Sequence, residues 1–158
     1  MAKGINVQQS GINEAIRQLE VVSDITPFAK MAIYDGAGIV AETMQNQVTS
    51  LKTSKNFAKG DKKRYALPED VKALKEHLGI AKMKSDLDKI NTKVGFEGYF
   101  KGRTKVDVAI QKVANSINSG TSFMYAQPFI KRTIKGSEAQ CVDAMSSSID
   151  KSLAKITK

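Results

Sequence analysis

The pattern of apolar and polar residues in the first part of the chain predicts a strand and a short helix. Residues 5–7 alternate in the manner of an edge strand. Ile12, Ile16 and Leu19 then recur at helical spacing and predict an amphipathic helix over residues 11–22. These two elements are expected to precede a much longer helix.

The longer helix is predicted from Thr26 onward. Thr is a favourable N-cap residue, and Pro27 suits the first helical position because the N–H that it lacks would be unpaired there. The apolar side of a helix of about 25 residues is then formed by Ile33, Ala37, Val40, Met44, Val48 and Leu51. Gly36 and Gly38 lie inside this helix, where each costs roughly 1 kcal/mol relative to Ala. They therefore indicate close packing against a neighbouring element, with a hinge as the alternative.

Three further helices are predicted in the rest of the chain. The first begins at Pro68, with acidic residues in its first turn, and is expected to end at Gly79. The apolar positions of the three helices are Val71, Leu74 and Leu78; Val106, Ile110, Val113 and Ile117; and, after Pro128, Ile130, Ile134, Val142, Met145, Ile149, Leu153 and Ile156. A break in the last helix near residues 136–137 is left open. Each apolar side is expected to face the core.

A strand is predicted between the helices. Residues 90–99 alternate around Thr92, Val94 and Phe96, and a hairpin with residues 80–83 would pair them. The predicted fold class is α+β, with the long N-terminal helix and the C-terminal helix packed on a small, mainly antiparallel β-sheet. The length of 158 residues suits a single domain over residues 1–158.

Residues 52–66 have little apolar content and no periodicity, so we predict a flexible basic loop. Its basic residues are Lys52, Lys55, Lys59, Lys62, Lys63 and Arg64. They could contact phosphates, in which case binding would weaken as salt is added. The alternative is a solvated loop that promotes solubility. The chain has a formal net charge of +9, and this cluster of basic residues is its main electrostatic feature.

Composition offers no support for an enzyme. A single cysteine, Cys141, excludes an internal disulfide framework and a Cys-based zinc site, and it is interpreted as a small buried residue. There is no Gly-rich phosphate loop, and His77 and residues 146–148 are interpreted as solvated positions on helices. We therefore predict no catalytic, metal-binding or cofactor-binding residues and no enzymatic activity.

Composition also bears on location and partners. No apolar run is long enough to span a membrane, and the first residues lack a signal-peptide core. Both observations predict a protein made in a reducing cytoplasm. The absence of Trp, with six Phe and four Tyr, argues against modules that stack single-stranded nucleic acid on aromatic rings.

The loop before the last helix contains a second candidate surface. Phe123, Met124 and Tyr125 form an apolar triplet after Gly120. Exposed apolar side chains of this size usually mark a contact with a partner. The alternative is that the loop folds back and fills the core of the domain.

Three segments of the chain resemble the head–tail joining, or tail-completion, proteins of long-tailed bacteriophages. Residues 120–131 (GTSFMYAQPFIK) are similar to the family's Gly-Thr-Ser signature followed by Pro-Phe, an aliphatic residue and a basic residue. Residues 77–83 (HLGIAKM) resemble its Leu-Gly-Ile turn, and residues 93–99 (KVGFEGY) resemble its Val-Gly-Phe strand. The lysine-rich loop stands where the family commonly has a Thr-Gly-x-Leu element.

The resemblance implies a structural subunit of the virion neck, which is made in the host cytoplasm. Such proteins assemble into a ring, with a hexamer as the candidate stoichiometry, between the head connector and the tail tube or terminator, and genomic DNA passes through the bore. A ring of this kind needs a head-to-tail contact that closes. The expected interface residues are Phe123, Met124, Tyr125, Pro128 and Phe129. The basic loop would then face a neighbouring protein rather than DNA.

Two other functions remain open. A basic DNA-binding accessory protein would explain the net charge and the loop over residues 52–64. A toxin-like or processing enzyme is the weaker alternative, because no cluster of catalytic side chains is apparent.

Overall fold

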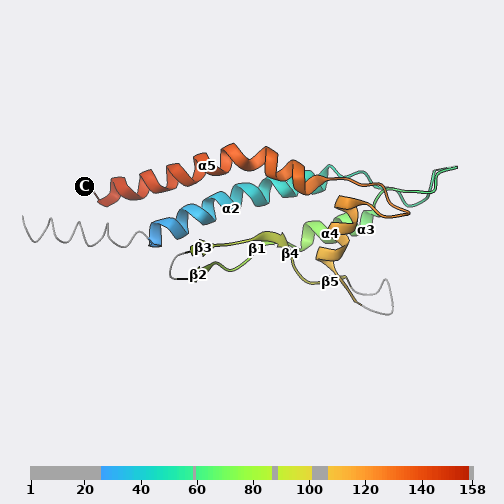
Figure 1. The fold of residues 1–158 in the computed structure, drawn as a ribbon, viewed down its shortest axis with the longest axis horizontal. Helices are drawn as coiled ribbons and strands as arrows, with labels where there is room; N and C mark the ends of the chain where they lie inside the picture. Colours follow the sequence, from blue (N-terminus) through green and yellow to red (C-terminus); the bar gives the residue numbers. More distant parts are fainter. Residues whose placement is uncertain (1–25, 59, 87–88, 101–106, 157–158) are drawn as a thin grey trace, which may run out of the picture.

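A computed structural model gives the structure of the chain and describes residues 26–58, 60–86, 89–100 and 107–156 (Figure 1). The strand expected at residues 5–7 and the helix expected at residues 11–22 lie outside the described residues, as do Lys59 and Val106.

The described residues form helices and short strands in the order that the sequence predicts. They are α2 (Thr26–Thr49), α3 (Pro68–Glu76), β1 (Leu78–Ile80), β2 (Lys84–Asp86), β3 (Lys89–Asn91), β4 (Val94–Phe96), β5 (Tyr99–Phe100), β6 (Val108–Ala109), α4 (Ile110–Ser119) and α5 (Phe129–Ile156). The long helix predicted from Thr26 onward is present over Thr26–Thr49, and the residues before Thr26 lie outside the described ranges. The last helix is continuous through residues 136–137.

The described strands pair in twos, and each pair is antiparallel. β1 pairs with β4, placing Leu78 opposite Phe96 and Ile80 opposite Val94. The predicted hairpin is thus present, but Leu78 was wrongly assigned to the preceding helix. That helix ends at Glu76, because the chain then turns at His77 and Leu78 pairs with β4. The other pairs are β2 with β3 and β5 with β6.

Helix α2 lies between α5 and the strands (Figure 1). The two long helices run antiparallel, so that the start of α2 and the end of α5 lie at the same end of the molecule. Helix α5 also reaches the strands at its first residue, where the Phe129 ring meets Phe96 edge-on at 6.1 Å. The structure confirms the α+β fold class, with two long helices above small antiparallel strand pairs.

The large apolar side chains of the core gather at one end of this helix pair. The most deeply buried are Val48 of α2, Leu74 of α3, Ile110 and Ile117 of α4, and Phe129 of α5. They come from four different helices, and β4 adds Phe96 beneath them. We call this region the core end. Burying apolar area of this kind is the main stabilising contribution to folding.

The other half of the helix pair, residues 26–38 and 141–156, is packed differently, and we call it the distal half. Helix α2 buries Ala32, Gly36 and Ala37 there. At Gly36 the helices approach so closely that a Cβ atom would lie 2.8 Å from Met145 Cγ and 2.9 Å from Cys141 Sγ. Close packing at Gly36 is therefore confirmed. Gly38 has open space instead, so the same prediction is wrong there.

Helix α5 turns small and polar side chains toward α2. Thr133, Ser137, Ser148 and Ser152 are buried. Three of their hydroxyls donate to the backbone carbonyl four residues earlier, over 2.8–2.9 Å: Thr133 to Phe129, Ser137 to Thr133, and Ser152 to Ser148. These internal bonds satisfy the hydroxyls, so burying them costs little. Ser148, which was interpreted as solvated, is therefore part of the helix contact.

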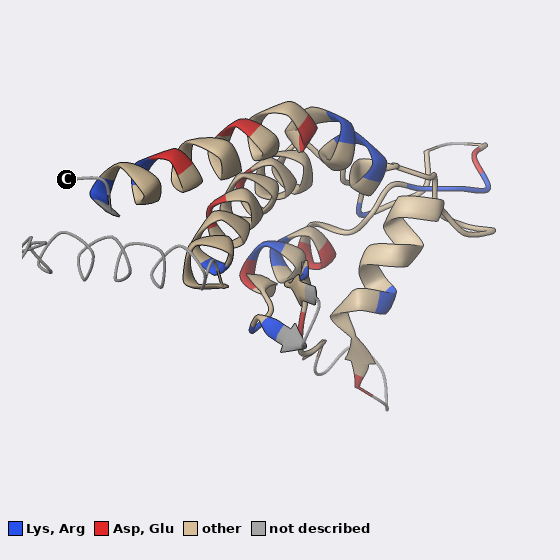
Figure 2. Ribbon diagram, turned by 60° about the vertical axis from the view of Figure 1, so that its left-hand side comes forward, with Lys and Arg blue, Asp and Glu red and all other residues tan. Residues whose placement is uncertain are grey.

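The predicted orientation of α5 is wrong for most of its length. Ile134, Val142, Ile149 and Leu153 were expected in the core but are exposed, with Val142 at 57%. The side of α5 that packs on α2 carries Cys141 and Met145, which lie against Gly36, and the buried Ser148 and Ser152. The four exposed apolar residues consequently face outward. Figure 2 shows the accompanying charges: Lys and Arg colour both ends of α5, with Asp and Glu between them.

Candidate interaction surface

The basic loop and the Phe123 loop, which are remote in sequence, lie side by side in the fold. The Arg64 N–H donates to the Phe123 carbonyl and the Tyr125 N–H donates to the Arg64 carbonyl, each over 3.0 Å. These bonds form a parallel bridge between Arg64 and Met124. The two candidate surfaces of the sequence thus form one continuous surface, which we call the two-loop surface.

Gln127 fastens the start of the basic loop to the same surface. Its buried side-chain amide donates to the Lys52 carbonyl over 3.0 Å, and its oxygen accepts from the Lys52 N–H over 2.8 Å. Its own N–H donates to the Ile117 carbonyl. Sequence reasoning missed Gln127, because a single polar residue before a Pro has no local pattern that points to a contact 75 positions away.

The Gly-Thr-Ser segment makes a tight turn that presents Phe123. Gly120 has φ 74°, and a Cβ there would lie 2.8 Å from the Ala126 nitrogen, so this position requires glycine. The Thr121 N–H donates to the Met124 carbonyl over 3.0 Å, and the Phe123 N–H donates to the Thr121 hydroxyl over 3.4 Å. The turn therefore points Phe123 away from the core that Met124 joins.

The structure divides the five expected interface residues into two groups. Met124 is 7% exposed and Phe129 is fully buried, so both belong to the core of the chain itself. They are core residues rather than a surface for a partner. Phe123 is 52% exposed, Pro128 is exposed and Tyr125 is half-buried. The interface prediction is thereby narrowed to these three residues.

The basic side chains belong to the other loop of the two-loop surface. Lys52, Lys55, Lys62 and Lys63 are exposed and Arg64 is half-buried. Lys52 Nζ lies 5.6 Å from the centre of the Tyr65 ring, and the Arg64 guanidinium lies 5.8 Å from that of Phe57. Cations at these distances are attracted to the face of an aromatic ring. The loop thus makes cation–ring contacts within itself, and its flexibility stays a prediction of the sequence.

Tyr125 stacks obliquely on Tyr65, with ring centres 5.2 Å apart. Partial burial raises the pKa of the Tyr125 phenol, and the nearby Asp61 carboxylate raises it further by its charge and by accepting a hydrogen bond. The raised pKa means that these surroundings favour the neutral phenol, which donates to Asp61, over the phenolate.

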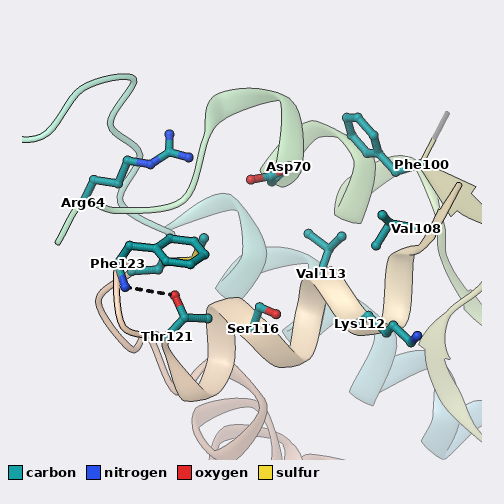
Figure 3. A pocket seen from close by; sticks show the side chains of 10 residues that line it. Arg64, Asp70, Phe100, Val108, Lys112, Val113, Ser116, Thr121 and Phe123 are labelled. Atoms are coloured by element: carbon teal, nitrogen blue, oxygen red, sulfur yellow. Dashed lines mark hydrogen bonds between the residues drawn. The ribbon is translucent and has the colours of Figure 1, made fainter. Parts of the chain in front are cut away.

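A pocket of about 250 Å³ opens beside Phe123 (Figure 3). Phe100, Val108 and Val113 line one part of it, and Arg64 and Lys112 add positive charge. Asp70, also in the lining, is buried, and its carboxylate accepts the Leu67 N–H over 3.3 Å at the start of α3. An apolar side chain from a partner, accompanied by a carboxylate, would suit this chemistry.

His77 and Cys141, which the sequence analysis also considered, both pack against neighbouring residues of the chain. His77 is half-buried and packs beside Gly98, where a Cβ would lie 2.9 Å from His77 Nδ1. Cys141 is half-buried against Met145. Within the described ranges, no group of three or more His, Cys, Asp or Glu side chains could hold a metal ion. No helix among the residues described is long and apolar enough to cross a membrane.

Comparison with known proteins gives no relative for this chain: no protein-family model, no curated protein and no solved structure matches it.

Proposed function

We propose that the chain is a structural subunit of the bacteriophage neck, which forms a ring that completes the tail and joins it to the head connector. The two-loop surface would contact a neighbouring protein, either the connector or the tail tube and its terminator. Genomic DNA would pass through the bore of the ring. The chain would act by assembly and would have no enzymatic activity.

The observation that carries this proposal is that the three resembling segments pack against one another. Residues 77–83 and 93–99 supply β1 and β4, which pair with each other. Residues 120–131 supply Phe129, whose ring meets Phe96 of β4. Segments that are weak motifs one by one thus form a single structural unit, as a family signature should. The two-loop surface extends from this unit.

The proposal is tested by mixing the purified chain with the tail-tube protein of the same genome. We expect a defined ring, or a capped tube, whose mass is measured by light scattering. Phe123→Ser should weaken binding to the tube, while Ile134→Ser, a change of a similarly exposed apolar residue on α5 outside the two-loop surface, serves as the control. A chain that ignores the tube and connector proteins would contradict the proposal.

The exposed lysines of the basic loop support a second candidate function, binding to duplex DNA as an accessory protein. Binding through phosphates would weaken steeply and linearly on a log–log plot as salt is raised. Replacing Lys62, Lys63 and Arg64 with Ala should then abolish the shift of a DNA fragment. Retention of the shift by this triple variant would exclude the loop as a DNA site.

A further inference from the structure

One side of the distal half exposes a row of apolar side chains, Val142, Ile149 and Leu153, which we call the α5 ridge. They are 57%, 39% and 42% exposed. With about 100° of rotation per residue, these three positions point within roughly 40° of one another. Large apolar groups gathered on one exposed face usually mark a contact with another molecule.

The same helix pair has a hollow of about 570 Å³ between α2 and α5, which we call the α2–α5 hollow. Gly38, Ala144 and Ser147 keep it open, because their side chains are small. Met31 and Tyr34 line its α2 side and are 50% and 43% exposed. The hollow therefore combines space with apolar surface, which suits apolar side chains of moderate size.

The ridge and the hollow face opposite directions. Lys151 lines the hollow and lies two positions after Ile149 of the ridge, so the two side chains point roughly 160° apart. Two different, complementary surfaces on opposite sides of one subunit favour a head-to-tail contact, in which every copy uses both. Contacts of this type close into rings or continue as filaments.

The ridge and the hollow also lie at the same level along the helix pair. Gly36 faces Cys141 and Met145, and Gly136 lies beside Thr43. Since the helices are antiparallel, Met31 is level with about residue 148 of α5. A second copy placed alongside without an axial shift thus brings its Ile149 to the Met31 of the first.

Charge supports the same alignment. Lys135 lies one heptad before Val142, hence on the ridge side of α5, and is exposed. Glu42 lies one heptad after Asp35, which lines the hollow, and is also exposed. By the antiparallel pairing, Glu42 is level with about residue 137 of α5. Neighbouring copies would therefore bring Lys135 and Glu42 together.

We infer that the partner of the α5 ridge is a second copy of this chain, whose α2–α5 hollow receives the ridge, with Lys135 paired to Glu42 across the contact. The inference rests on the proposed function for the closure of these contacts into a ring. It assigns the contact between subunits to the α2–α5 helix pair, with its apolar part in the distal half, and leaves the two-loop surface for other neck proteins.

Cysteine crosslinking of the full-length chain tests the geometry, in a Cys141→Ser background. Met31→Cys combined with Ile149→Cys should give a ladder of disulfide-linked species under mild oxidation. Neither single variant should link to itself, and a mixture of the two single variants should give covalent dimers only. Self-linking of the Ile149→Cys variant would reveal a twofold contact and overturn the inference, as would a double variant that gives no linked species.

A charge exchange gives a second test that does not depend on packing. Lys135→Glu should weaken self-association about tenfold, as measured by sedimentation, and adding Glu42→Lys should restore it. Lys93→Glu, a change of an exposed lysine between β3 and β4 and outside both long helices, is the matched control. Equal effects of Lys135→Glu and Lys93→Glu, or no restoration in the double variant, would overturn the pairing.

The outcomes also separate this inference from the proposed function. Copies that link through Met31 and Ile149 but ignore the tail-tube protein would sustain the contact and contradict the neck assignment. If the copies form rings on the tube and changes at the ridge have no effect on these rings, the neck assignment would be sustained and the inferred contact would be contradicted. A chain that stays monomeric even with the tube protein would overturn the inference and leave the ridge to another occupant, including residues 1–25 of the same chain.

Discussion

The two ends of the α2–α5 helix pair are packed on different principles. At the core end, Val48 and Phe129 are fully buried among large apolar side chains from α3, α4 and β4. In the distal half, Gly36 and the buried serines bring the helices together, while Val142 and Ile149 face outward. The same two helices thus bury their large residues at one end and expose them at the other.

This difference separates what holds the chain together from what it offers to a partner. The stability of the single chain comes mainly from the core end, because free energy of burial scales with the apolar area removed from water. The distal half brings small side chains into close contact and leaves its larger apolar side chains exposed, so it contributes less. The inferred contact between copies would cover this exposed side.

The largest expected effect tests this comparison directly. Phe129→Ala should destabilise the chain by about 3–5 kcal/mol, since it removes a fully buried ring and leaves a cavity. Val142→Ala removes an exposed side chain and should change the free energy of unfolding of the monomer by about 0.5 kcal/mol or less. Denaturant unfolding at a concentration where the chain is monomeric measures both. Similar losses of unfolding free energy in the two variants would refute the conclusion that the stability of the single chain comes mainly from the core end.

The second-largest expected effect concerns the hydrogen bonds that join the core end to the basic loop. Gln127→Ala removes the two hydrogen bonds that connect its side chain to the Lys52 backbone. We expect a loss of about 2 kcal/mol, because the Lys52 groups lose their partner. Amide exchange should accelerate at Lys52, while Val71 in α3 keeps its protection unless the whole chain unfolds. If amide exchange accelerated equally at Lys52 and Val71, the loop would not open independently of the core end.

A smaller effect distinguishes two glycines of the distal half. Gly36→Ala forces Met145 and Cys141 to move and should cost about 1 kcal/mol net, after the gain in helix propensity. Gly38→Ala meets open space and should stabilise α2 by up to about 1 kcal/mol. Thermal unfolding of the two variants measures this difference. Two variants of equal stability would show that the helices do not need their close approach.

Local signals in the sequence predicted the beginnings of elements well. Pro68 begins α3 as expected, because the preference for Pro at the first helical position depends on the local backbone alone. The alternation around Val94 and Phe96 likewise identified β4, and Ile80 is its partner. Where only short-range rules apply, the sequence was sufficient for the fold.

The failures came from choices between competing partners. Leu78 has helical spacing from Leu74, yet pairing with Phe96 placed it in a strand. Val142 and Ile149 have the periodicity of a core face, but periodicity does not identify what covers that face. For the candidate site, the sequence found both loops of the two-loop surface and could not find the contact between them. It also offered no way to separate Phe123 from Met124.

The smallest predicted effect is the alkaline response of the two-loop surface. Burial and Asp61 raise the pKa of Tyr125 in the folded chain above its ordinary value of about 10. The protonated phenol is therefore favoured by folding, so its contribution is complete below pH of about 10 and is lost as the pH rises through the folded-state pKa. Tyr125→Phe should remove this part of the alkaline loss of stability, and Asp61→Asn should reduce it. The comparison is made by denaturant unfolding between pH 8 and about 11, with Tyr99→Phe, an exposed tyrosine, as the control for general alkaline effects. Tyr125 precedes α5 at the core end, so the crosslinks between Met31 and Ile149 in the distal half should form equally well in the Tyr125→Phe variant. A loss of these crosslinks would show that the two ends of the helix pair are coupled rather than separate.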